Sequence, residues 1–207
     1  VTPDALTKTY GTADPTLTYS LSATSSATLT TTGSLTRAAG EDVGDYAINL
    51  GTLTNTNYTL SLASENFNIT PLSVTITPDA LTKTFGTDDP TLTYSLSATS
   101  SATLTATGSL TRVVGEDVGD YAIGLGTLSN TNYTLSLASE NFNITPLSVT
   151  VTPDALTKVH GNLDPLLTYS LSATSSATLT TSGFLTRVAG EDVGDYAIGL
   201  GTLSNTN

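Results

Sequence analysis

The sequence predicts a mainly β protein built of three small antiparallel-β modules in tandem, arranged as an elongated rod. First, the 207 residues repeat with a period of 75, so that Pro3, Pro78 and Pro153 occupy equivalent positions. Second, apolar and polar residues alternate over short segments of each repeat, which is the period-two pattern of strands with one buried face. Third, Gly, Pro, Asn and Asp residues separate these segments, as expected of turns between strands.

The copies are nearly identical and are offset from the two ends of the chain. Residues 1–75 and 76–150 differ at 8 positions, and residues 151–207 differ from the second copy at 10 of 57 positions. The strand pattern predicts modules at 1–71, 72–146 and 147–207. The first lacks the start of its first strand, and the third lacks its last two strands. Because only one proline separates consecutive modules, we expect each pair to be held at a restricted angle.

The first half of the complete module is expected to hold three strands. Residues 72–76 alternate β-branched and polar side chains and form the first of them. Residues 79–90 contain a Gly turn and an Asp-Pro corner, which are typical of a loop. Residues 91–96 alternate again and form the second strand. Residues 97–108 form either a loop or one helical turn, and residues 109–112 form a short third strand.

The second half of the module is expected to hold three more strands. Residues 115–119 form a turn, and residues 120–128 form the strand that follows it. A hairpin turn at residues 129–132 leads into a strand at residues 133–137. A last strand at residues 141–145 closes the module.

Composition excludes several classes of partner. The formal net charge is −12 and only 6 residues are Lys or Arg. We therefore expect neither nucleic acid nor an anionic membrane as a partner, since both require a basic surface. The absence of Cys removes disulfides and thiolate metal sites, which is compatible with an exported bacterial protein. We expect no membrane insertion in this segment, and any export signal or anchor to lie outside it.

The sequence provides no catalytic or cofactor-binding residues. His160 is the only histidine, and Tyr10 and Phe85 occupy its place in the other copies. A catalytic base would not be replaced in this way, and a base also needs a positioned partner. We therefore expect a packing or surface role for His160, and no enzyme activity.

An acidic cluster that recurs in each copy is the one candidate metal site. Three carboxylates lie within five residues around a Gly, and Ca²⁺ favours such oxygen ligands. The spacing fits neither the EF-hand loop nor the nonapeptide calcium repeat, so a solvated turn is the leading interpretation and a weak calcium site the alternative. A nearby Arg is expected to neutralise part of the charge. The candidates are Glu41, Asp42, Asp45, Glu116, Asp117, Asp120, Glu191, Asp192 and Asp195.

Several motifs of the first copy resemble a known family. They are Tyr10-Gly11, Asp14-Pro15, the Gly33–Arg37 segment, the Gly40–Ile48 segment, Asn57-Tyr58-Thr59-Leu60 and Phe67-Asn68-Ile69-Thr70-Pro71. Together they resemble the MBG domain of the type named for its Tyr-Gly motif, which occurs in tandem in large bacterial surface adhesins and haemagglutinin-like exoproteins. The resemblance implies a small β-grasp-like fold, with an Ig-like sandwich as the alternative. It also implies a secreted or surface-exposed location, and it carries no catalytic residues to transfer.

The leading functional hypothesis is a non-catalytic stalk or spacer that projects the binding domain of an adhesin from a bacterial cell surface. Its partners are then neighbouring repeats of the same chain. One alternative is an extracellular filament in which identical chains share strands, since a module that lacks strands exposes sheet edges. Another alternative is that the repeats themselves bind glycans or a surface.

Overall fold

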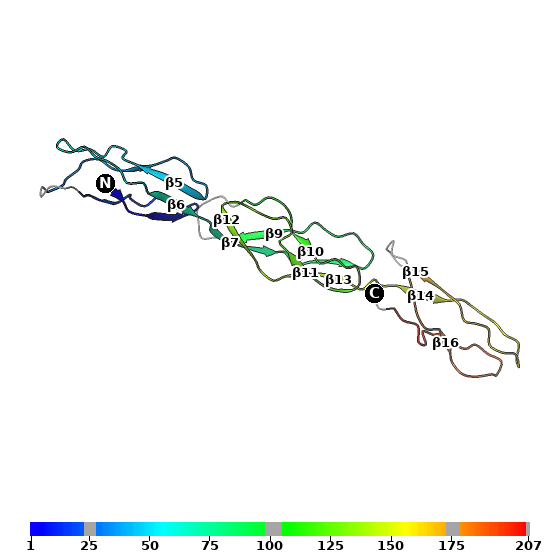
Figure 1. Cartoon of the computed structure of the whole chain (residues 1–207). Coiled ribbons are helices and arrows are strands. Elements are labelled where there is room, and N and C mark those ends of the chain that lie inside the picture. Colours follow the sequence, from blue (N-terminus) through cyan, green and yellow to red (C-terminus); the bar gives the residue numbers. More distant parts are fainter. Residues whose placement is uncertain (23–27, 98–104, 173–178, 206–207) are drawn as a thin grey trace. The chain divides into compact units, whose positions relative to one another are not determined.

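The computed structural model describes residues 1–22, 28–97, 105–172 and 179–205 and contains strands but no helix within those ranges (Figure 1). This confirms a mainly β fold with three tandem repeat units. The loop or helical turn predicted for residues 97–108 falls largely outside the described residues.

A three-stranded sheet of the second repeat has β7 (Leu72–Pro78) at its centre. Its neighbours are β9 (Tyr94–Ser97), which is antiparallel to β7, and β12 (Tyr133–Leu137), which is parallel to it. Buried and more exposed residues alternate along β7, and Val74 and Ile76 are almost fully buried. The predicted strand at residues 72–76 is therefore confirmed, because its alternation matches the pleat.

A four-stranded sheet of the second repeat has the order β10-β11-β13-β8. Its central strand β13 (Asn141–Thr145) is antiparallel to β11 (Gly119–Gly124) and parallel to β8 (Leu81–Thr84). The short β10 (Thr111–Arg112) borders β11. Phe142 and Ile144 of β13 are completely buried. The predicted strand at residues 141–145 is thus confirmed.

The repeats contain mixed sheets and not the purely antiparallel sheets that were predicted, because β12 and β8 each pair in parallel. The predicted hairpin at residues 129–132 is also wrong, because β12 pairs with β7 and not with β11. A turn ends β11 at Gly124, well before residue 128: Gly126 has φ 58°, and the Leu128 N–H donates to the Leu125 carbonyl at 3.0 Å. The chain then continues to the other sheet, where β12 lies beside β7.

Strand β8 lies in a segment that was predicted to be a loop. The inward-facing residue of its Leu-Thr-Lys-Thr sequence is Lys83, which is buried. A charged residue at that position hides the apolar alternation that usually predicts a strand. The strand forms because β13 supplies its hydrogen-bonding partner.

The first repeat has the same four-stranded arrangement, in the order β2-β6-β5-β4. Its strands are β2 (Leu6–Thr9), β4 (Thr36–Arg37), β5 (Gly44–Asn49) and β6 (Asn66–Thr70), and a separate pair joins β1 (Thr2–Pro3) to β3 (Tyr19–Ser20). Its buried core consists of Leu35, Ile48, Leu53, Phe67 and Ile69.

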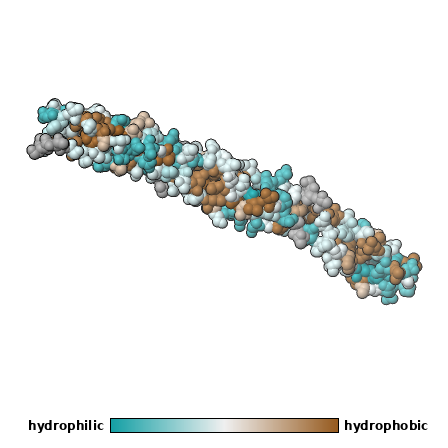
Figure 2. Space-filling model, in the orientation of Figure 1, coloured by the Kyte–Doolittle hydropathy of each residue, from teal (hydrophilic) through white to brown (hydrophobic). Residues whose placement is uncertain are grey.

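The third repeat retains two strand pairs among its described residues. These are β14 (Thr150–Pro153) with β15 (Tyr169–Ser172), and β16 (Thr186–Arg187) with β17 (Ile198–Gly199). The described residues of this repeat end at 205 and include no equivalent of β12 or β13. Val159, Leu163 and Leu166 are exposed, and apolar surface is visible over this repeat in Figure 2.

The chain divides into two compact units that do not coincide with the sequence repeats. One unit contains the first repeat together with sheet β12-β7-β9. The other contains sheet β10-β11-β13-β8 together with the third repeat. The two sheets of the second repeat thus belong to different units.

Candidate functional site

Each repeat brings one Lys, one Arg, one Asp and one Glu into a single ion cluster. In the second repeat, Lys83 Nζ lies 2.6 Å from Asp89 Oδ1 and also contacts Glu116. Arg112 Nε lies 2.6 Å from Asp89 Oδ2, and Arg112 Nη2 lies 2.6 Å from Glu116 Oε1. Both cations therefore contact both carboxylates. Lys83 and Arg112 stand on the two outer strands of the sheet, β8 and β10, and the two carboxylates bridge them.

Arg112 also connects the cluster to the core. Its Nη1 donates to the carbonyls of Val113 at 3.0 Å and Gly115 at 2.6 Å. Its guanidinium carbon lies 5.1 Å from the ring centroid of Phe142 and 5.2 Å from that of Tyr121. This is a cation–π arrangement against a buried ring.

The cluster perturbs the acidity of its members. Hydrogen bonds from Arg112, and then from Lys83, lower the pKa of Asp89 from 3.8 to about 2, although burial acts in the opposite direction. The pKa of Glu116 is also lowered, chiefly by its hydrogen bond from Lys83. Burial acts to lower the pKa of Lys83, but its hydrogen bonds to the two carboxylates outweigh burial and the pKa is raised. All four groups are therefore charged at neutral pH, and the arrangement provides no general base.

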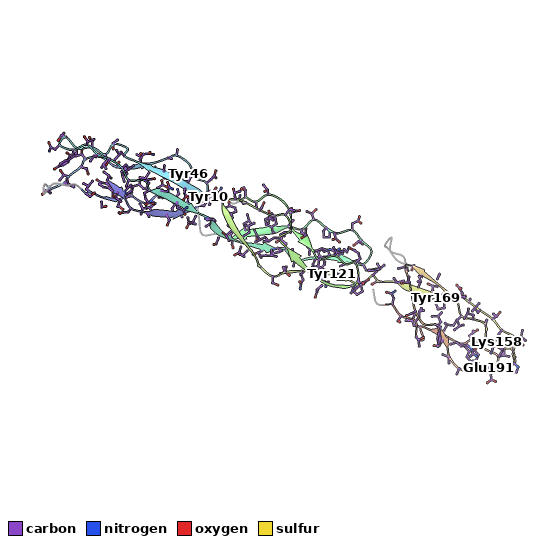
Figure 3. The ribbon with its side chains drawn as sticks, viewed as in Figure 1. Tyr10, Tyr46, Tyr121, Lys158, Tyr169 and Glu191 are labelled. Atoms are coloured by element: carbon purple, nitrogen blue, oxygen red, sulfur yellow. The ribbon has the colours of Figure 1, made fainter. Side chains whose placement is uncertain are left out.

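The same cluster recurs in the other repeats. Its members are Lys8, Asp14, Arg37 and Glu41 in the first repeat, and Lys158, Asp164, Arg187 and Glu191 in the third. Figure 3 shows Lys158 and Glu191 side by side. The third cluster is more open, since 21% of the Lys158 side chain is exposed, compared with 3% for Lys83.

These clusters use every cationic side chain of the protein. The sequence has 6 Lys and Arg and 18 Asp and Glu, and the three clusters hold 6 of each sign. The 12 remaining carboxylates account for the net charge of −12. Outside the clusters, the surface therefore carries only negative side-chain charges.

The predicted calcium ligands do not converge in the first repeat. Glu41 contacts Lys8 and Arg37, whereas Asp42 Oδ1 accepts a hydrogen bond from Asn132 Nδ2 at 2.8 Å. Asp45 Oδ1 accepts one from Asn68 Nδ2 at 2.7 Å. Each carboxylate thus has a partner of its own.

In the described residues of the other repeats, the candidate carboxylates do not form a metal site either. Glu116 and Glu191 belong to the ion clusters, and Asp120 Oδ1 accepts from Asn143 Nδ2 at 2.6 Å. The backbone carbonyls of Asp117 and Asp192 each accept a tyrosine hydroxyl at 2.8 Å, and Asp195 lines an open cavity. No group of three or more His, Asp or Glu is arranged to hold a metal ion within the described ranges. Calcium binding stays a prediction.

The sequence interpretation recognised Arg112 and Glu116 as neighbours but missed Lys83 and Asp89. Lys83 shares a strand face with Leu81, and Asp89 precedes the Asp-Pro corner of the same loop. A lysine two residues from an apolar residue, and so on the same face of a strand, is the signal that could have indicated a buried, paired cation. His160 is exposed, in a turn.

The Tyr-Gly motif forms a tight turn directly after β2. Gly11 has φ 79°, a value that favours glycine, and the Thr12 N–H donates to the Thr9 carbonyl at 3.1 Å. The Tyr10 N–H donates to the Thr70 carbonyl at 2.9 Å. The motif therefore places the Tyr10 ring at the end of the first repeat, next to β12 (Figures 1 and 3).

None of the described segments forms an apolar helix of membrane-spanning length. No curated protein and no solved structure matches the chain. The family model of the MBG domain (YGX type) matches residues 1–68, 74–143 and 149–207. MBG repeat domains are found in adhesin-like surface proteins and form a family of structural repeats, not a known enzyme family. With nearly all of its residues matched, the chain belongs to the MBG domain family of the YGX type and carries three tandem copies.

Proposed function

We propose that this chain is a non-catalytic stalk or spacer of a secreted or cell-surface bacterial adhesin, in which the repeats project a binding domain. The observation that carries the proposal is the use of all six cationic side chains inside the three ion clusters. Their charge supports the fold of each repeat and is not presented to a ligand. The remaining negative side chains repel one another, which keeps an array of like modules soluble and separate.

A second candidate is a filament in which chains share strands. A groove in the third repeat is lined by Leu147, Val149 and Val151, among other residues. The equivalent residues of the second repeat form β7, which is buried with β12 beside it. The groove therefore has the place and the apolar lining of a site for an extended strand, which residues 58–62 of a second copy would fill.

The first repeat restricts how a second copy could donate that strand. Val1 already takes the position of Ile76: the Ala63 N–H donates to the Val1 carbonyl at 2.8 Å, as the Ala138 N–H does to Ile76. Residues 58–62 could pair with another chain only after leaving their own repeat. Strand sharing would therefore be slow, and the fraction of chains that share strands would rise with protein concentration.

Small-angle scattering and light scattering over a wide concentration range test both candidates. The spacer predicts an elongated monomer whose mass is constant at every concentration. A compact globule would contradict the spacer. A mass that rises with concentration and incubation time, and stays that of a single chain when residues 58–62 carry Leu60→Asp, would favour strand sharing.

A further inference from the structure

Asn132 of the second repeat is bound to a turn of the first repeat. Its Oδ1 accepts the Val43 N–H at 2.8 Å, and its Nδ2 donates to Asp42 Oδ1 at 2.8 Å. The backbone N–H of Asn132 donates to Asn130 Oδ1 at 2.8 Å, and its carbonyl accepts the Leu72 N–H at 3.0 Å. Both backbone groups of Asn132 are thus hydrogen-bonded within the second repeat, while its side-chain amide binds the turn of the first repeat.

The next residue makes the apolar half of the same contact. The rings of Tyr133 and Tyr10 have centroids 5.8 Å apart and an interplanar angle of 73°, an edge-to-face pair. Such pairs stabilise a contact beyond the area that they bury. Tyr10 belongs to the Tyr-Gly motif, whose turn orients the ring, and Tyr133 begins β12.

The equivalent residues of other repeats are more exposed in this structure. Val43 is half-buried, whereas its equivalent Val193 in the third repeat is 93% exposed. Tyr133 is buried, whereas its equivalent Tyr58 in the first repeat is half-buried. The contact therefore covers side chains that are more accessible at the equivalent positions of the other repeats.

We propose that Asn132 and Tyr133 form a recognition site for the preceding repeat, with the Asp42–Val43 turn and the Tyr10 ring as its partner surface. The site docks sheet β12-β7-β9 on the first repeat and holds the two in one orientation. Its partner is any repeat that presents an Asp-Val turn beside an aromatic ring. The site joins repeats in the same way whether or not the array acts as a spacer.

The chemistry of the amide makes the site selective. One side-chain amide both accepts from a backbone N–H and donates to a carboxylate, which neither an ionised Asp nor an Ala can do. The Asn and the Asp-Val pair are identical in all three copies, while the aromatic position varies as Tyr10, Phe85 and His160. The residues of the polar half are thus present in every copy, whereas the aromatic residue differs between copies.

Because the protein has no Cys, a pair of spin labels can be placed at Ser64→Cys and Ser139→Cys. These are equivalent, exposed positions in the first and second repeats. We expect a narrow distance distribution in the full chain, and one at least twice as wide with Asn132→Ala. Hydrogen exchange at the Val43 amide should become at least tenfold faster in the same variant. Asn57→Ala, the matched change in the first repeat, should alter neither measurement.

A swap of the two polar partners tests the geometry directly. Asn132→Asp places two carboxylates face to face and should widen the distribution, whereas the double variant with Asp42→Asn should restore it. An unchanged width with Asn132→Asp, or no recovery in the double variant, would overturn the proposal. The double variant keeps this test decisive even if Asn132→Ala lowers the stability of the repeat.

Discussion

At the residue scale, Arg112 combines three interactions in one side chain. It pairs with two carboxylates, donates to two backbone carbonyls and covers the ring of Phe142. Its planar group suits such a position, since it offers several donors in a fixed geometry. Lys83 cannot replace it, because an ammonium group contacts the carboxylates as a point charge and lies against neither carbonyl.

Replacing Arg112 tests this role. We expect Arg112→Ala to lower the free energy of unfolding of the second repeat by about 2 kcal/mol, because it uncovers the buried ring of Phe142 and removes the donor to two backbone carbonyls and two carboxylates. Arg112→Lys keeps the charge and should cost roughly half as much. The matched Arg187→Ala should cost least, since Arg187 is more exposed and, among the described residues, no ring equivalent to Phe142 covers it. Urea denaturation followed by circular dichroism measures all three, and equal losses for Arg112 and Arg187 would contradict the role of the ring.

The same cluster predicts an acid-sensitive fold. Because the folded pKa of Asp89 is about 2 and its ordinary value is 3.8, its contribution to stability is present above pH 4 and is lost as the pH falls toward 2. The carboxylate is 41% exposed, so the contribution is roughly 1 kcal/mol after solvent screening. The midpoint of thermal unfolding should therefore be constant from pH 7 to about 5 and fall below that. Asp89→Asn should be less stable at neutral pH but lose less on acidification. A parallel fall in both proteins would show that other carboxylates dominate.

At the scale of the elements, the central strand of the four-stranded sheet determines whether the sheet forms. In the second repeat β13 pairs with both β8 and β11. In the third repeat, whose described residues include no equivalent of β13, residues 156–159 form no strand, and only Ile198–Gly199 remain of the β11 equivalent. The ion cluster persists there but is more exposed. The four charges thus do not by themselves order the sheet.

The sequence predicted the strands that show a clear alternation of apolar and polar residues. It did not predict the features that depend on pairing with distant segments. Residues 72–76 and 141–145 alternate in a way that survives in the structure. The pairing of β12 with β7 joins segments about 60 residues apart. The alternation of apolar and polar residues does not indicate which strands pair or whether they pair in parallel. Strand β8 was missed because its inward residue is a lysine whose partners, Asp89 and Glu116, lie outside the strand.

At the scale of the whole molecule, three nearly identical sequences occupy different surroundings. One hydrogen bond recurs in each repeat with the same length of 2.9 Å: Ala38 to Ala47, Val113 to Ala122, and Val188 to Ala197. In the first two repeats the acceptor belongs to a strand that the central strand pairs, whereas Ala197 lies outside any strand. A comparison of the three repeats therefore separates the effect of this hydrogen bond on local stability from the effect of the surrounding strands.

Hydrogen exchange at these three amides should reveal a gradient of local stability. An amide exchanges when its segment opens, so the rate reports the stability of the surrounding structure more than the length of one bond. We expect the Val188 amide to exchange at least about a hundred times faster than Val113, and Val113 to match Ala38 within about tenfold. Adding a synthetic peptide with the sequence of residues 133–145 should slow exchange at Val188 alone, because the first two repeats already have their central strands, β6 and β13, in place. Equal rates at Val113 and Val188 without peptide would mean that the ion cluster, and not the central strand, sets the local stability of a repeat.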